Sequence, residues 1–186
     1  VMYNGFLQNI NSLNNLTITG KVTLDNNNVF QGSVVVQDTL QSNEYGGGST
    51  VFTLLIEGDL TNNGFIKNIN SGDVLSLEVT GNIINNGLWQ NSYTKFKGSQ
   101  DQHITSLSGH VFDGDFYDLD STSLIIANTS LKFSGNINLG RAILDMQDNE
   151  LIINNIKWIY NGYLKNAKLQ NGLLSDLRLL GQIEIN

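Results

Sequence analysis

Apolar and polar residues alternate in short stretches along the whole chain. In LTITGKVTL, residues 16–24, the apolar positions Leu16, Ile18, Val22 and Leu24 alternate with Thr, Gly and Lys. SLEVTGNI and LRLLGQIEI, residues 76–83 and 177–185, follow the same pattern. A period of two is typical of β-strands with one buried face, whereas Asn, Gly, Thr and β-branched residues disfavour helices. The pattern therefore predicts an all-β protein.

One sentence of sequence is written twice. LLIEGDLTNNGFIKN starts at Leu54, and LEVTGNIINNGLWQN starts 23 residues later at Leu77. Both copies read apolar-x-apolar-x-Gly-x-apolar-x-Asn-Asn-Gly. Glycine within a strand pattern marks a bend where a side chain would clash, and Asn-Gly clusters tolerate the backbone angles of turns. Each copy thus predicts two short strands, each followed by a corner.

The first half of this motif recurs along the chain. Its glycines are Gly20, Gly58, Gly81, Gly135 and Gly181, with separations of 38, 23, 54 and 46 residues. These values are roughly one, two or three multiples of a unit of about 18 to 27 residues, which is the range of short solenoid repeats. We interpret the glycines as shared positions of one repeat.

Two architectures are compatible with these signals. A β-sandwich of hairpins needs turn signals every 8–12 residues, and these are present. A parallel β-helix needs the same signals and also a repeat as long as one coil, so that residue n stacks on residue n+23. The repeat favours a right-handed parallel β-helix of about nine coils, in a single domain over residues 1–186, with the β-sandwich as the alternative.

Two further expectations follow from the β-helix. Asn side chains at equivalent corners should form hydrogen bonds from coil to coil, as in cross-β ladders. The segment QSNEYGGGST, residues 41–50, should leave the rod as a loop insertion. The last residues, GQIEIN, read as a strand without a polar cap, and such an edge favours pairing with another chain. We therefore expect a fragment of a longer protein.

Composition and charge exclude several classes of function. The 186 residues carry a formal net charge of −7 and contain no Cys. Nucleic-acid binding needs a basic surface, and neither that nor a basic amphipathic membrane helix is present. The chain has no apolar run long enough for a membrane span. The lack of Cys excludes disulfides and Cys-based zinc sites.

The candidate polar chemistry lies in HVFDGDFYDLD, residues 110–120. Its carboxylates Asp113, Asp115 and Asp118 suit an acid pair for glycoside hydrolysis or a calcium site, although the spacing of an EF-hand is missing. Alternatively, Phe112, Phe116 and Leu119 point inward, and the carboxylates form a solvated face. The bound ion would then be adventitious calcium, and we expect no other cofactor.

The candidate aromatic contacts are Trp89 and Tyr93. Together with Trp158, Tyr160 and Tyr163 they could form sugar-stacking platforms, or they could equally fill corners. The two histidines, His103 and His110, have no metal-ligand spacing, and we interpret them as solvated or structural. There is no Walker loop and no nucleophile elbow. We therefore expect no enzymatic activity.

The stretch from Lys95 to Ile153 resembles a pattern of large bacterial cell-surface proteins, the adhesin-like β-solenoid proteins that are often exported by the type IX system. GNIINNG and GDLTNNG are similar to echoes in filamentous-haemagglutinin-like and autotransporter stalks. The matching residues are Gln102, Ile104, Phe116, Leu119, Leu131, Phe133, Leu144, Asp145, Asn149, Leu151 and Ile153. The resemblance implies a secreted or cell-surface segment and transfers no catalytic residue.

We therefore expect a non-catalytic stalk or adhesive module. Its partners would be a glycan, another cell-surface ligand or copies of itself stacked through open coil ends. One alternative function is a carbohydrate-active β-helix enzyme fragment, similar to polysaccharide lyases or hydrolases, that uses Asp113, Asp115 or Asp118. A second alternative is a filament subunit.

Overall fold

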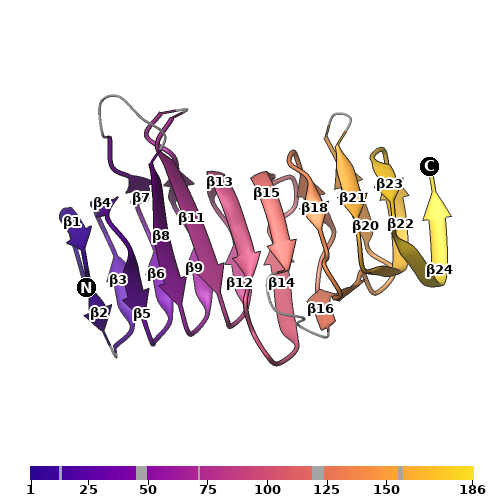
Figure 1. The fold of residues 1–186 in the computed structure, drawn as a ribbon, viewed down its shortest axis with the longest axis horizontal. Coiled ribbons are helices and arrows are strands. Elements are labelled where there is room, and N and C mark those ends of the chain that lie inside the picture. Colours follow the sequence, from indigo (N-terminus) through magenta and orange to yellow (C-terminus); the bar gives the residue numbers. More distant parts are fainter. Residues whose placement is uncertain (13, 45–49, 71, 119–123, 155–156) are drawn as a thin grey trace.

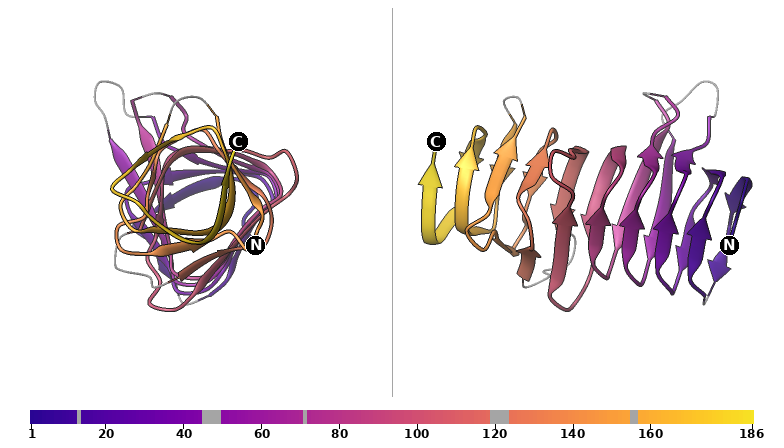
Figure 2. Two further views of the ribbon diagram at one scale, coloured as in Figure 1. Left: turned by 90° about the vertical axis from the view of Figure 1, so that its right-hand side faces the viewer. Right: turned by 180° about the vertical axis from the view of Figure 1, so that it is seen from behind.

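The computed structural model describes residues 1–12, 14–44, 50–70, 72–118, 124–154 and 157–186. These residues contain 24 β-strands and no helix, and every strand pairing among them is parallel. The strands stack along one long axis, with the two termini at opposite ends (Figure 1). Seen down that axis, successive turns superpose into one closed outline (Figure 2). The fold is a parallel β-solenoid, which confirms the predicted class and excludes the antiparallel hairpins of a β-sandwich.

The strands form three columns, which we name faces A, B and C; the chain visits them in that order in every turn. Three long strands, β13, β15 and β22, bend around a corner and serve two faces, as does β24. Face A contains β1 (Gly5–Gln8), β4 (Lys21–Asp25), β7 (Thr39–Ser42), β10 (Phe65–Lys67), β13 (Leu88–Phe96), β15 (Phe112–Asp118), β17 (Leu131–Phe133), β20 (Glu150–Ile153), β22 (Tyr163–Gln170) and β24 (Arg178–Ile185). Face B contains β2 (Asn11–Ser12), β5 (Asn28–Phe30), β8 (Val51–Ile56), β11 (Val74–Val79), the second halves of β13 and β15, β18 (Ile137–Asn138), β21 (Trp158–Tyr160) and β23 (Leu173–Ser175). Face C contains β3 (Leu16–Ile18), β6 (Val34–Val36), β9 (Leu60–Asn62), β12 (Ile83–Asn85), β14 (Gln102–Ser106), β16 (Leu124–Ala127), β19 (Ile143–Asp145) and the first halves of β22 and β24.

The length of a turn varies along the rod. One unbroken column of paired residues on face A steps through seven turns from Gly5 to Ile153, each 17 to 26 residues long; its members are Gly5, Val22, Leu40, Ile66, Trp89, Phe112, Phe133 and Ile153. Beyond it, Leu151 pairs with Leu169 and Leu169 with Ile185, in shorter steps of 18 and 16 residues. The sequence predicted about nine coils of uniform length, and the structure has no uniform coil length.

The repeated sentence is in the predicted register. Leu54 pairs with Leu77 and Leu60 with Ile83, so equivalent residues stack one turn apart at a separation of 23. Their side chains point inward and are buried, as are the alternating apolar residues of the other turns. Each turn therefore covers the apolar side of its neighbours, which is how a repeat protein gains its stability.

Asparagine ladders join neighbouring turns, as predicted. Asn62 Nδ2 donates to Asn85 Oδ1 at 2.9 Å, and both side chains are fully buried. On the outside of the same corner, Asn86 Nδ2 donates to Asn63 Oδ1 at 2.9 Å. These bonds satisfy amide groups that would be costly to bury without partners.

The motif glycines lie at corners, but not at one equivalent corner. Gly58 and Gly81 lie between faces B and C, Gly20 and Gly181 between faces C and A, and Gly135 between faces A and B. The interpretation of all five as shared positions of one repeat was therefore wrong. The motif marks the end of a buried strand, and every face ends in such a corner.

The predicted loop at residues 41–50 begins later than expected. Gln41 and Ser42 belong to β7, and their side chains are buried, with Gln41 Nε2 donating to Thr23 Oγ1 at 3.4 Å. Residues 45–49 lie outside the described residues. The longest turn, from Leu40 to Ile66, spans this region.

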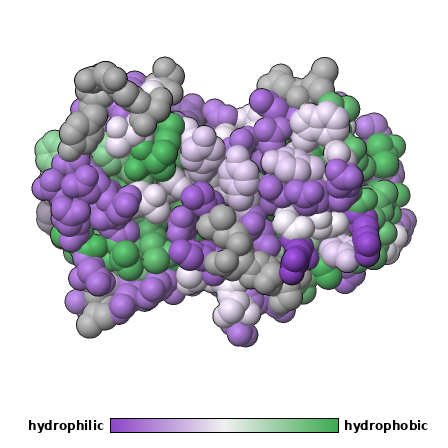
Figure 3. Space-filling view, in the orientation of Figure 1, coloured by the Kyte–Doolittle hydropathy of each residue, from purple (hydrophilic) through white to green (hydrophobic). Residues whose placement is uncertain are grey.

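Hydrophobic side chains gather towards both ends of the rod, and polar or weakly polar ones cover its middle in the view of Figure 3. At the C-terminal end, Leu179 and Ile185 continue inward columns yet are 45% and 62% exposed. Self-association through coil ends stays a prediction. In the described part of the chain, no helix is long and apolar enough to cross a membrane.

Candidate ligand-binding face

Trp89 lies in the core rather than on the surface. Its side chain is 1% exposed, packs edge-on against Phe112 with 5.1 Å between ring centroids, and donates from Nε1 to Thr94 Oγ1 at 3.2 Å. The inward column of face A fixes this orientation, because Trp89 pairs with Ile66 and Phe112. As a candidate ligand contact Trp89 was therefore wrong, and the other reading, a space-filling aromatic, holds.

The structure separates the candidate carboxylates. Gly114, with a φ of +98°, turns β15 around the corner between faces A and B, so that Asp113 lies on face A and Asp115 on face B. Asp113 accepts a hydrogen bond from the Ser134 hydroxyl, and Asp118 lies at the end of β15 beside Gly140. Leu119 lies outside the described residues. Phe112 and Phe116 point inward as expected.

No metal site joins these carboxylates among the described residues, since no group of three or more His, Cys, Asp or Glu side chains there could hold an ion. His103 Nδ1 lies 2.9 Å from Asn128 Oδ1, and His110 Nδ1 donates to the Gly87 carbonyl at 2.6 Å. Both histidines therefore contact corner groups. Calcium binding stays an untested expectation.

Tyr93 is the candidate that the structure places in a larger constellation. Face B carries two outward rows of side chains, each contributed by successive turns. One row contains Tyr93, Asp115, Asn136, Trp158 and Leu173. The other contains Glu78, Lys95, Tyr117, Asn138, Tyr160 and Ser175. We name Tyr93, Tyr117, Trp158 and Tyr160 the aromatic patch.

Two tyrosines on adjacent turns form the first half of the patch. The ring centroids of Tyr93 and Tyr117 are 5.9 Å apart, at an interplanar angle of 53°. The Tyr117 hydroxyl donates to Asp115 Oδ2 at 3.0 Å, which fixes the ring. Burial, together with this hydrogen bond and the negative charge of Asp115, raises the pKa of Tyr117 well above its ordinary value of 10.0. Tyr117 therefore stays a neutral donor.

The second half of the patch is held by a relay of side chains. Asp115 Oδ1 accepts the Asn136 backbone N–H at 2.8 Å, and Asn136 Oδ1 accepts the Trp158 backbone N–H at 3.0 Å. Trp158 is 45% exposed, and Tyr160 lies two residues further on the same strand, also pointing outward. One carboxylate thus connects the strands that carry both halves.

Several donors of this face remain available to a ligand. Among the described residues, no protein acceptor binds the hydroxyls of Tyr93 and Tyr160, the indole N–H of Trp158 or Nδ2 of Asn138. Asn138 is nevertheless fixed, because its Oδ1 accepts the Asn161 amide at 2.8 Å. The face therefore offers rings and donors whose supporting strands are already ordered.

An ion-pair cluster borders the patch. Glu78 contacts Lys95 at 3.2 Å and Lys97 at 2.9 Å. Burial by itself would raise the pKa of Glu78, but the hydrogen bonds and charges of the two lysines outweigh it, so the pKa lies below its ordinary value of 4.5. The carboxylate is therefore ionised and paired at neutral pH.

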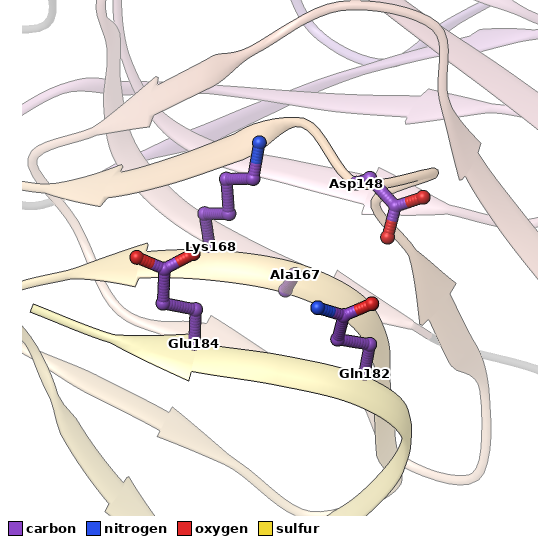
Figure 4. A pocket seen from close by; sticks show the side chains of 5 residues that line it. All are labelled: Asp148, Ala167, Lys168, Gln182 and Glu184. Atoms are coloured by element: carbon purple, nitrogen blue, oxygen red, sulfur yellow. The ribbon is translucent and has the colours of Figure 1, made fainter.

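The surface hollows of the molecule lie elsewhere. Two adjoining hollows on the face A side share Gly109 and His110, and their polar groups include Asn128 and Thr129, which form hydrogen bonds to the turn before them. A smaller hollow near the C-terminal end is shown in Figure 4, where Asp148, Lys168, Gln182 and Glu184 surround Ala167. In register, Lys168 lies between Glu150 and Glu184, an alternation of charge typical of a solvated sheet surface.

Sequence reasoning missed the patch as a unit. Tyr117 and the asparagines Asn136 and Asn138 were not among the candidates, although they lie on the polar side of the alternating pattern. The available signal was the outward position of aromatic residues in strands, where polar residues are the rule. Which of these residues meet depends on turn lengths of 20 to 23 that the sequence does not reveal.

No known protein-family model matches the chain, and no curated protein or solved structure matches it either.

Proposed function

We propose that this β-solenoid is a structural and adhesive module of a secreted or cell-surface bacterial protein, and that it holds a ligand on face B. The observation that carries the proposal is the aromatic patch with its ordered polar groups. Exposed aromatic rings with a polar tip contribute much of the energy of known binding surfaces. The extracellular location rests on the resemblance of the strand and corner motifs to adhesin-like solenoids.

The architecture suits such a role. Strands in the middle of the rod are paired on both sides, so that their outward side chains stand on a continuous hydrogen-bonded sheet. A surface whose side chains are already ordered loses little conformational entropy on binding. A stack of turns also spaces this surface away from whatever adjoins the module.

The test is adhesion of the purified chain to an array that carries both glycans and extracellular proteins. We expect at least one retained ligand, and we expect Trp158→Ala with Tyr160→Ala to reduce its retention at least tenfold. Phe65→Ala is the matched control, because Phe65 on face A is also 45% exposed. Retention that the two patch substitutions leave unchanged would contradict the proposal, as would the lack of any retained ligand.

A further inference from the structure

We infer that the aromatic patch binds an extended, uncharged polysaccharide whose chain runs along the axis of the rod. This inference rests on the proposed adhesive function and specifies the ligand class of the same face.

The patch has two aromatic platforms separated along the axis. Tyr93 and Tyr117 form the first, and Trp158 and Tyr160 form the second. Tyr117 pairs with Asn138 and Asn138 with Tyr160, so these two tyrosines are two turns apart. At the spacing of neighbouring strands this is about 10 Å. That distance is close to one disaccharide of an extended chain, so the two platforms can stack on alternate sugar rings.

The chemistry of the patch matches both surfaces of a sugar. The face of a pyranose ring presents C–H groups, which pack on the apolar face of an aromatic ring. The edge of the ring presents hydroxyls, which need donors and acceptors. Between the two platforms lie Asn136, Asn138 and the Asp115 carboxylate. A site that combines apolar walls with a few placed polar groups is the usual form of a small-molecule site.

Charge favours an uncharged ligand. The chain has a formal net charge of −7, and the patch contains the carboxylate of Asp115. The nearest described cations in the outward rows, Lys95 and the adjacent Lys97, are both paired with Glu78. A polyanionic glycan would meet repulsion without a free cationic partner, whereas a neutral glycan would not.

A peptide ligand fits this face less well. Extended peptides bind to sheets mainly by adding a strand to an unpaired edge. At the patch, β18 is paired with β15 on one side and with β21 on the other, so no backbone groups of this strand are left for a peptide. Recognition must therefore go through side chains, which is the way in which sugars are bound.

The test uses soluble hexasaccharides of β-1,4-linked glucose, mannose and N-acetylglucosamine as neutral probes, with hexagalacturonate as the anionic probe. Titration calorimetry, together with the fluorescence of Trp158, measures binding. We expect at least one neutral hexasaccharide to bind, its disaccharide to bind at least tenfold more weakly, and hexagalacturonate not to bind. Trp158→Ala and Tyr117→Ala should each weaken the hexasaccharide at least tenfold, and Phe65→Ala should leave it unchanged.

Circular dichroism checks that each variant is folded, and Tyr117→Phe, which keeps the ring, provides a second variant should Tyr117→Ala unfold. We expect Tyr117→Phe to weaken binding less than Trp158→Ala does. Binding of hexagalacturonate alone, or of no hexasaccharide, would overturn the inference. If the array instead shows a protein ligand that depends on Trp158, the adhesive function stands and the glycan assignment fails.

Discussion

The carboxylate of Asp59 holds the backbone of Asn82, one turn away, with Oδ1 accepting the Asn82 N–H at 2.6 Å. This bond is one step of a relay that climbs the corner between faces B and C. Asn15 accepts the Ser33 N–H at 2.8 Å, Ser33 Oγ the Asp59 N–H at 3.0 Å, and Asn82 Oδ1 the His103 N–H at 2.8 Å. Each side chain thus replaces a ladder bond at a corner, where consecutive strands change direction.

Removing one step of this relay should destabilise the protein. Asp59→Ala leaves the partly buried N–H of Asn82 without its acceptor, and we expect the free energy of unfolding to fall by about 1 to 2 kcal/mol. Asp59→Asn keeps a carbonyl acceptor and should cost less than about 1 kcal/mol. Urea unfolding followed by circular dichroism measures both. Equal losses for the two variants would show that the relay bond does not stabilise the fold.

The same relay explains how far the sequence could be read. The parallel stack was predictable because Leu54 and Leu77, and Asn62 and Asn85, repeat at a fixed separation that only a coil preserves. Inward positions follow from alternation within each strand, as for Phe112. Local patterns therefore define the strands and the type of corner.

The positions of side chains on the surface were less predictable. Trp89 belongs to the same alternation as Ile66, and its pairing shows that it points inward, although tryptophan alone suggests a surface contact. Asp113 and Asp115 are two residues apart and lie on different faces because Gly114 turns the corner between them. Long-range neighbours such as Tyr117 and Tyr160 depend on the lengths of the intervening turns, and these vary along the rod.

A corner glycine should be essential where the next turn approaches closely. A Cβ at Gly87 would overlap the carbonyl oxygen of Gly64, which belongs to the backbone and cannot move without shifting a whole turn. We expect Gly87→Ala to lower the free energy of unfolding by about 3 kcal/mol or more. The control is Gly109→Ala, where a Cβ meets nothing within 4 Å but φ is +84°, so that only about 1 kcal/mol of strain is expected. Similar losses in both variants would contradict the close approach.

The two tryptophans should respond differently to a quencher in solution. Trp89 is 1% exposed and Trp158 is 45% exposed. In Trp89→Phe the remaining fluorescence comes from Trp158, and we expect acrylamide to quench it strongly. In Trp158→Phe the remaining fluorescence comes from the buried Trp89 and should be quenched several-fold less. A strongly quenched Trp89 would contradict its place in the core.

Acid should weaken the fold through Glu78 and Asp145. Burial raises the pKa of Asp145, but its ion pair with Lys165 at 2.8 Å and the N–H of Gln147 lower it more, so the pKa lies below 3.8. Both carboxylates therefore have lower pKa values in the folded state than in the unfolded state. Their contribution is fully present above about pH 4.5 and is lost as the pH falls through the folded pKa values.

The measurement for this acid effect is the free energy of unfolding at a series of pH values between about 6 and about 3. We expect Asp145→Asn combined with Glu78→Gln to flatten the fall that the unmodified protein shows over this range. Asp176→Asn is the control, since Asp176 is exposed and forms no ion pair among the described residues. A fall as steep in the double variant as in the unmodified protein would assign the acid sensitivity to other groups.

Alkali should reveal the buried hydroxyl of the aromatic patch. The pKa of Tyr117 is raised in the folded protein by burial and by the hydrogen bond to Asp115, whereas in the unfolded chain it is near 10.0. The unfolded chain therefore releases this proton first, so the contribution of Tyr117 is intact below pH 10 and is lost as the pH rises beyond it. Ultraviolet titration of the folded protein should show one of the six tyrosines ionising last, and Tyr117→Phe should remove that late step. Tyr3→Phe, at a position that is 71% exposed, should leave the late step in place. A late step that persists in Tyr117→Phe would mean that the Asp115 hydrogen bond does not hold this ring, and the preorganisation of the patch would then lack its first support.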